Sequence, residues 1–107
     1  MRFWEVLMGR REDGRESGHA VERLCAALCA LETPEEARAL LSDICSPREL
    51  SDLAQRLEVA TMLRSGASYL DVSHATGASS TTVSRVSKCL NGPVGGYRVV
   101  LSRLDRQ

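Results

Sequence analysis

The stretch YLDVSHATGASSTTVSRVSKCL, residues 69–90, decides the fold, because it predicts two short helices joined by a tight turn. Gly77 ends the first helix and can adopt the left-handed backbone conformation that such a turn needs. Ser79 can cap the second helix, and the small Ser73 lies where the two helices cross. Four apolar residues are expected to pack the pair together: Val72, Ala78, Val83 and Val86. We therefore interpret the segment as a helix-turn-helix.

The outer face of the second helix is expected to carry hydroxyl and basic side chains. They are Ser79, Ser80, Thr81, Ser84, Arg85 and Lys88. No acidic residue occurs between Ser73 and Leu90. A helix that enters the major groove of DNA needs such a face, since hydroxyls can bind phosphate or base edges, Arg85 can contact guanine and Lys88 can neutralise phosphate. The alternative is a solvated helical hairpin whose basic face is incidental.

Two residues depart from the usual helix-turn-helix pattern. Ser73 stands in place of the usual alanine, and Thr76 stands where an aliphatic residue would pack. Short helix pairs with a glycine turn are also common in other proteins, so the motif alone does not establish DNA binding.

Upstream of this segment the sequence predicts three more helices, and no segment shows the alternation of a β-strand. Residues 19–31 are apolar nearly all round, which in a small protein indicates a subunit interface. Thr33–Glu36 and Ser46–Glu49 are capping boxes that open the next two helices, the first through Ile44 and the second to a left-handed cap at Gly66. One face of the longer helix carries Leu50, Leu53, Ala54, Leu57, Ala60 and Leu63.

The composition also favours an all-α domain. The chain has 107 residues, of which 43% are apolar and four are aromatic, so its core must be aliphatic. Residues 1–18 are expected to form a flexible arm, although residues 1–8 could be a short docking helix, and residues 19–107 are expected to form one helical domain. Near the C-terminus, residues 97–104 suit a helix, with a strand left open. A single domain of this size is only marginally stable as a monomer, so a partner subunit is expected.

The charge of the chain is distributed unevenly. The formal net charge is zero, but residues 1–50 hold seven arginines against ten acidic residues, which gives −3. Residues 51–107 hold seven basic against four acidic residues, which gives +3. This asymmetry indicates a localised basic surface and is compatible with binding of double-stranded DNA.

Several classes of protein are excluded or disfavoured. No apolar run approaches the roughly 18–20 residues of a membrane-spanning helix, so no membrane partner and a cytoplasmic location are expected. The four cysteines are expected to be reduced, buried and without metal, because none has zinc-finger spacing. They are Cys25, Cys29, Cys45 and Cys89. No phosphate loop, paired carboxylates or activated nucleophile is present, so we expect neither an enzyme nor a cofactor.

Residues from about Leu24 to Leu104 resemble the Trp-repressor-like proteins of the YerC/YecD type. The motifs that carry the resemblance are Cys45–Leu50, Leu53–Ala60, Thr76–Ser79, Val83–Val86 and Gly95–Tyr97. Their order and spacing over about eighty residues make the resemblance specific. It implies an all-α, interlocked homodimer that presents two recognition helices to successive major grooves, and a role as a sequence-specific transcriptional regulator, expected to be a repressor.

The chain resembles the tryptophan-sensing repressor itself less closely. That protein holds its corepressor with two arginines. Arg56 and Arg85 lie close to the corresponding positions, provided that the alignment allows a one-residue change in the turn around Gly66. The residue after the second arginine should be glycine, to leave room for an indole, but here Val86 would fill that space. We therefore expect no tight binding of tryptophan. We expect Arg85 to serve mainly as a DNA contact and only secondarily as an effector-binding residue.

Two other hypotheses remain at this point. The protein could be a dimeric interaction module with weak or no DNA binding, or a regulator switched by a small aromatic ligand. Arg56 need not bind a ligand at all, because it could pair with Glu49 or Asp52.

Overall fold

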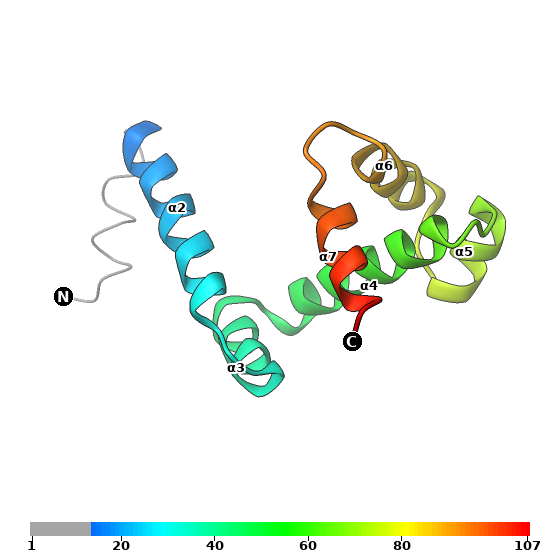
Figure 1. The fold of residues 1–107 in the computed structure, drawn as a ribbon. Helices are drawn as coiled ribbons and strands as arrows, with labels where there is room; N and C mark the ends of the chain where they lie inside the picture. Colours follow the sequence, from blue (N-terminus) through cyan, green and yellow to red (C-terminus); the bar gives the residue numbers. More distant parts are fainter. Residues whose placement is uncertain (1–13) are drawn as a thin grey trace. The chain divides into compact units, whose positions relative to one another are not determined.

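The computed structural model describes residues 14–107, and these residues form six α-helices and no β-strand (Figure 1). The helices are α2 (Gly14–Ala30), α3 (Pro34–Ile44), α4 (Pro47–Arg64), α5 (Tyr69–Thr76), α6 (Ser80–Leu90) and α7 (Gly96–Leu104). The chain divides after Ile44 into two units, so that α2 and α3 belong to one and α4–α7 to the other. Residues 97–104 are helical, which resolves the choice between helix and strand.

The first unit begins earlier than the sequence predicts. Helix α2 starts at Gly14, five residues before the expected His19, because Arg15 and Glu16 are good helix formers and a single glycine at position 18 is tolerated. The rest of the expected flexible arm, including the docking helix suggested for residues 1–8, lies outside the described residues. Among residues 18–30 every side chain except the half-buried Ala20 is exposed, and α3 has no buried residue.

Both predicted capping boxes are formed, one of them in a modified way. At α4 the Ser46 hydroxyl accepts a hydrogen bond from the Glu49 N–H at 3.1 Å, and the Glu49 carboxylate accepts one from the Ser46 N–H at 2.8 Å. Both bonds lower the pKa of the Glu49 carboxyl below its ordinary value, and the bond with the Ser46 backbone has the larger effect. At α3 Thr33 accepts from the Glu36 N–H, but the Glu36 carboxylate binds the N–H of Glu32.

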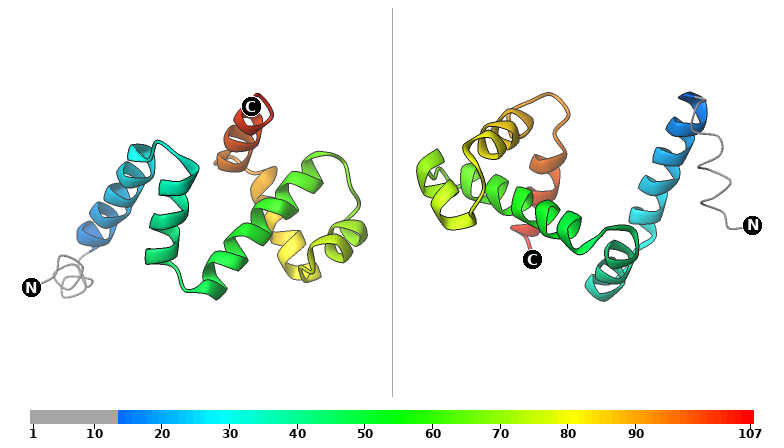
Figure 2. Two further views of the ribbon diagram at one scale, coloured as in Figure 1. Left: turned by 90° about the horizontal axis from the view of Figure 1, so that it is seen from below. Right: turned by 180° about the vertical axis from the view of Figure 1, so that it is seen from behind.

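The core of the second unit is small and aliphatic. Its fully or nearly buried residues are Val59, Ala60, Val72, Ala78, Val83, Val86, Leu90 and Leu101. All four residues predicted to pack the two hairpin helices are among them. The turn after α5 folds the chain back so that α6 packs against α4, and Figure 2 shows this unit from two further sides.

The predicted apolar face of α4 is only partly buried. Ala60 is buried and Leu63 packs against the core, whereas Leu53 and Leu57 remain exposed. Val59, which the spacing does not assign to that face, is fully buried. The shared apolar face of α4 therefore does not coincide with the residues that are buried in this chain, because α4 packs against three helices and not against a single flat surface.

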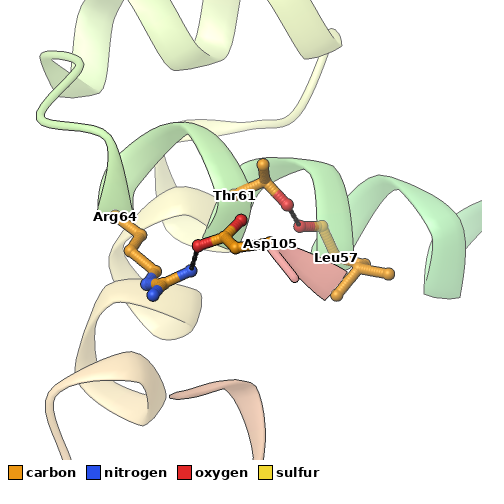
Figure 3. Close-up of polar contacts among 4 residues, drawn as sticks. All are labelled: Leu57, Thr61, Arg64 and Asp105. Atoms are coloured by element: carbon orange, nitrogen blue, oxygen red, sulfur yellow. Dashed lines mark hydrogen bonds and ion pairs between the residues drawn. The ribbon is translucent and has the colours of Figure 1, made fainter. Parts of the chain in front are cut away.

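Helix α7 returns to α4 and closes the second unit. Leu101 is buried, and the exposed Arg64 of α4 donates a hydrogen bond from Nη1 to Asp105 Oδ2 at 2.6 Å (Figure 3). In the same view the Thr61 hydroxyl donates to the Leu57 carbonyl at 2.8 Å within α4. Val100 and Leu104, which also suit packing by their spacing, remain about half exposed in the single chain.

Candidate nucleic-acid interface

Helix α6 is fixed at its N-terminus by a serine cap. The Ser79 hydroxyl accepts a hydrogen bond from the Thr82 N–H at 3.1 Å, and it lies 3.1 Å from the Thr82 hydroxyl, to which it can donate. The backbone N–H groups of the first helical turn, with the positive end of the helix dipole, lie beside exposed hydroxyls at this end. Such a helix terminus favours an anionic ligand such as phosphate.

The tight turn before α6 is held by the residues that depart from the usual pattern. Gly77 has φ = 75°, in the left-handed region, as predicted. The Ser73 hydroxyl donates to the Ala78 carbonyl at 2.7 Å, and the Thr76 hydroxyl accepts from the Ala78 N–H at 3.2 Å. From α4, Gln55 Nε2 donates to the Thr76 carbonyl at 3.1 Å. The polar side chains thus satisfy backbone groups of the turn where apolar packing was expected.

The two sides of α6 differ as the sequence predicts. Val83, Val86 and Leu90 are buried and fix one side of the helix on the core. Of the six residues predicted to face DNA, Ser84 is half-buried and the other five are exposed. These five are Ser79, Ser80, Thr81, Arg85 and Lys88. Their exposure agrees with the assigned face, while their contact with DNA stays a prediction.

The outer face of α6 carries positive charge and no acidic residue. In sequence, no acidic residue lies between Asp71, in the first turn of α5, and Asp105. Arg85 and Lys88 lie in this interval on α6, and both are exposed. Asp105 is paired with Arg64 and thus partly neutralised. A polyanion approaching the outer face of α6 therefore meets two cations that α6 itself presents.

The structure brings the two candidate effector residues together. Arg56 of α4 and Arg85 of α6 border one pocket of about 410 Å³. The other residues that line it are Thr82, Val86, Cys89 and Tyr97. Val86 is 3% exposed and belongs to the core, so its side chain forms a wall of the pocket. Within the described residues Arg56 forms no ion pair with Glu49 or Asp52, so the alternative of a local salt bridge is not realised.

The cysteines are all free thiols, but their predicted burial is wrong for the single chain. Cys25, Cys29 and Cys89 are exposed, and Cys45 is half-buried. The prediction failed because the apolar helix that carries Cys25 and Cys29 packs into no core in this chain. Over residues 14–107, no three histidine, cysteine, aspartate or glutamate side chains gather as a metal site would require. Over the same range, no helix has the length and hydropathy needed to span a membrane.

Three contacts around α6 were not foreseen from the sequence. They are the bond from Gln55 to the turn, a hydrogen bond from the Tyr69 hydroxyl to Ser87 Oγ at 2.5 Å, and the bonds from Arg98 to the end of α6. Tyr69 and Ser87 are 18 positions apart, and Gln55 and Thr76 are 21 apart. Helical periodicity predicts which residues share a face of one helix, so it carries no signal for such distant polar pairs.

Comparison with known proteins gives a consistent result at the level of sequence. Residues 19–105 match the family described as Trp repressor protein. The uncharacterised protein YerC of Bacillus subtilis is 40% identical over 87 residues, which cover 81% of this chain and 84% of YerC. The matched residues include both helices of the helix-turn-helix and every buried residue of the core.

Solved structures agree with this result. A TrpR-like protein from Eubacterium eligens superposes with a TM-score of 0.75 at 44% sequence identity, covering 81% of this chain and 90% of that one. A Staphylococcus aureus protein proposed to be a Trp repressor superposes with a TM-score of 0.77 at 34% identity, covering 83% and 89% respectively. With the sequence match, the shared fold and the capped helix-turn-helix all in agreement, this chain belongs to the Trp repressor family.

Proposed function

We propose that the protein is a sequence-specific DNA-binding regulator of transcription, a repressor, that acts as a homodimer. The observation that carries the proposal is the construction of α6. Its buried side holds it on the core, its capped N-terminus is open to solvent, and its outer side presents Arg85 and Lys88 with several hydroxyls. Membership of the Trp repressor family supports a regulator over an enzyme, because that family is non-enzymatic.

Each exposed residue has a role that follows from its chemistry. Arg85 carries a guanidinium that can donate two bonds to the O6 and N7 atoms of one guanine. Lys88, one turn further along, neutralises a backbone phosphate as a point charge. Ser79, Ser80 and Thr81 surround the N-terminus of α6, where hydroxyls and backbone N–H groups bind phosphate oxygens. Ser84 is half-buried and contributes at the edge of this surface.

The homodimer is supported by α2. Val21, Leu24 and Leu28 recur at helical spacing on this helix and are 57%, 43% and 46% exposed. Contiguous apolar surface of this kind marks an interaction site in a soluble protein. A second copy of the chain, interlocked with the first through this helix, would bury it and would present two copies of α6 to successive major grooves.

A second candidate, regulation by a small ligand, is favoured by the pocket that Arg56 and Arg85 share. Two guanidiniums can hold a carboxylate, and Tyr97 supplies an aromatic wall. We expect no tight binding of free tryptophan, because Val86 takes space that an indole needs. Calorimetry tests this point: micromolar binding of tryptophan that raises DNA affinity would establish an effector site, and no heat at millimolar tryptophan would leave a regulator that does not respond to it.

The experiment that tests DNA binding is selection of duplexes from a random pool, followed by salt titration of the selected duplex. A groove-binding protein loses affinity with a logarithmic salt slope of about −0.9 for each phosphate contact. Arg85→Ala should cost about 1–3 kcal/mol and relax preference at one base pair of each half-site. Arg85→Lys is the matched control, since it keeps the charge but loses the two-pronged contact.

Lys88→Ala should weaken binding to all sequences equally and reduce the salt slope. If the double variant Arg85→Ala, Lys88→Ala binds the selected duplex as well as the natural protein does, α6 is not the DNA-binding element. The protein would then be a dimeric interaction module.

A further inference from the structure

The C-terminal end of α6 is held by an arginine of the next helix. Arg98 Nη1 donates to the Leu90 carbonyl at 2.5 Å and to the Gly92 carbonyl at 2.8 Å. Leu90 is the last residue of α6, so the first bond satisfies a carbonyl group of the kind that a helix leaves without a partner at this end, and the second bond holds the loop that follows. A cation there also meets the negative end of the helix dipole.

The backbone before α7 leaves room for the Arg98 side chain. Gly95, the N-cap of α7, has φ = 81° and contributes no side chain. A Cβ at this position would lie 3.1 Å from Arg98 Nη2, tighter than an ordinary van der Waals contact. Glycine at position 95 therefore provides both the left-handed turn and the room for the guanidinium.

Apolar packing holds this flank of α6 only in part. A pocket of about 390 Å³ lies beside the last turn of the helix, and its lining includes Ser87, Leu90 and Asn91 from this end of α6 together with Leu63, Ala67 and Tyr69. The pocket is open at the surface, so Ser87 and Asn91 border solvent there, while Leu90 stays buried. The polar links at its border, from Arg98 and from Tyr69 to Ser87, connect α6 with α7 and α5 across this flank.

The position of Arg98 differs from that of the residues expected to contact DNA. Arg98 borders the pocket beside Ser87 and Leu90, whereas Arg85 borders the pocket on the other flank of α6. One guanidinium nitrogen of Arg98 is already committed to two carbonyl oxygens. Arg85 lies five residues before Leu90, about 7.5 Å along the helix axis, so a shift of the held end moves the base-contacting side chain directly.

We propose that Arg98 is a positioning residue for DNA recognition: it fixes the end of α6 through the Leu90 and Gly92 carbonyls and thereby sets where Arg85 and Lys88 meet the groove. The proposal rests on the proposed function of α6. Without Arg98 the last turn of α6 loses the two bonds that hold its end, and only the buried Leu90 still fixes it to the core. The loss should fall on sequence discrimination, since base contacts require a fixed geometry and phosphate attraction does not.

The experiment compares Arg98→Ala, Arg98→Lys and Lys88→Ala in the full-length chain, titrated with salt on the selected duplex and on a random duplex. For Arg98→Ala we expect affinity for the selected duplex to fall about ten-fold or more, a smaller loss on the random duplex, and an unchanged salt slope. Arg98→Lys keeps donors and charge near the carbonyls and should restore most of the affinity. Lys88→Ala should reduce the slope by about 0.9 for each phosphate that the lysine neutralises in the natural protein.

Amide hydrogen exchange of residues 87–92 in the DNA-free protein gives a second readout, and Arg98→Ala should accelerate it while a melting curve verifies that the chain is folded. A reduced salt slope in Arg98→Ala would make Arg98 a phosphate contact and overturn the proposal, as would unchanged affinity and discrimination.

If the natural protein binds no duplex, the proposed function fails, and exchange alone then decides whether Arg98 holds α6. Unchanged exchange would overturn that role too. If Arg98→Ala does not fold, Arg98→Met, which keeps most of the side-chain volume but has no hydrogen-bond donor, replaces it in the same comparison.

Discussion

The two units of this chain have similar apolar patterns but very different burial. In α4–α7, eight apolar side chains are buried or nearly so, and the helix-turn-helix is built around them. In α2 and α3, where apolar residues also recur at helical spacing, no side chain from residue 18 onward is fully buried. Periodicity therefore indicates which face of a helix is apolar, but it does not indicate what covers that face.

The difference has an energetic consequence. Leu24 and Leu28 each remain over 40% exposed, although burial of a leucine contributes about 1.5–3 kcal/mol. The second unit obtains this stabilisation within one chain, while α2 can obtain it only from an additional surface. The following substitutions test this division, beginning with the one that should change the protein most.

Leu24→Asp should abolish the proposed dimer. It places a charge in the centre of the apolar surface of α2, and burial of an unpaired carboxylate costs more than a small interface can supply. Sedimentation at micromolar concentration should show monomer or misfolded material. Glu22→Gln, a polar change on the same helix, is the control and should leave the assembly intact. If the natural protein is already a stable monomer, α2 has no partner copy and the comparison between the units must be reinterpreted.

Val83→Ala should destabilise the second unit by about 2 kcal/mol, because it removes two methyl groups from a fully buried position and leaves a cavity. Val94→Ala makes the same chemical change at a residue that is 93% exposed, and should alter the free energy of unfolding by less than about 0.5 kcal/mol. Urea denaturation measures both. Equal effects at the two positions would contradict the assignment of the core.

Gly77→Ala should cost about 1–2 kcal/mol, because φ = 75° places a side chain in the left-handed region. Gly18→Ala should have the opposite sign, since Gly18 lies in α2 with no heavy atom near its would-be Cβ and alanine favours the helix by roughly 0.5–1 kcal/mol. Thermal melting of the two variants compares a turn that needs glycine with a helix that does not. A stabilising Gly77→Ala would show that the turn tolerates another conformation.

Ser46→Ala should cost about 1 kcal/mol through loss of the α4 cap. Ser51→Ala, at an exposed position inside α4, should be neutral or slightly stabilising. The expected difference is small enough that both variants must be measured by denaturation in the same buffer.

The smallest expected effect is on the pH dependence of stability. The pKa of Glu49 is lowered in the folded chain by its bonds with Ser46, so its carboxylate stabilises the fold at neutral pH. This contribution is complete above the unfolded pKa, about 4.3, and is lost as the pH falls through the lower folded pKa. Glu49→Gln should therefore flatten the decline of stability below about pH 4. An identical acid profile in both proteins would contradict it.

Much of the fold could be predicted because local rules determine it. Ser46 and Ser79 each cap the helix that the sequence assigns to them, and Gly66 and Gly77 adopt positive φ at the predicted ends. The outer side of α6 was predicted because its inner side is set by Val83, Val86 and Leu90. In each case the relevant partners lie within a few residues along the chain.

The errors and omissions involve partners that are distant in sequence. Val59 was missed as a core residue because its burial depends on helices that follow it. The family resemblance suggested that Arg56 and Arg85 act together. That they border one pocket depends on how α4 packs against α6, which the sequence does not specify. The bonds from Gln55 and Arg98 satisfy backbone carbonyls, and any residue can supply a backbone carbonyl, so the sequence offers no pattern for them.

The pair of Arg64 and Asp105 bears on the order in which this chain folds and opens. It joins residues 41 positions apart, while the bonds of Ser73 and Thr76 within the α5–α6 turn span two to five positions and the one from Gln55 spans 21. Short loops close at lower entropic cost, so we expect the helix-turn-helix to form early and α7 to dock last. An exposed ion pair contributes about 0–1 kcal/mol, so it is also easily broken. We then expect the C-terminal helix to detach before the helix-turn-helix opens, and its departure frees the end of α6 and exposes Leu101 of the core.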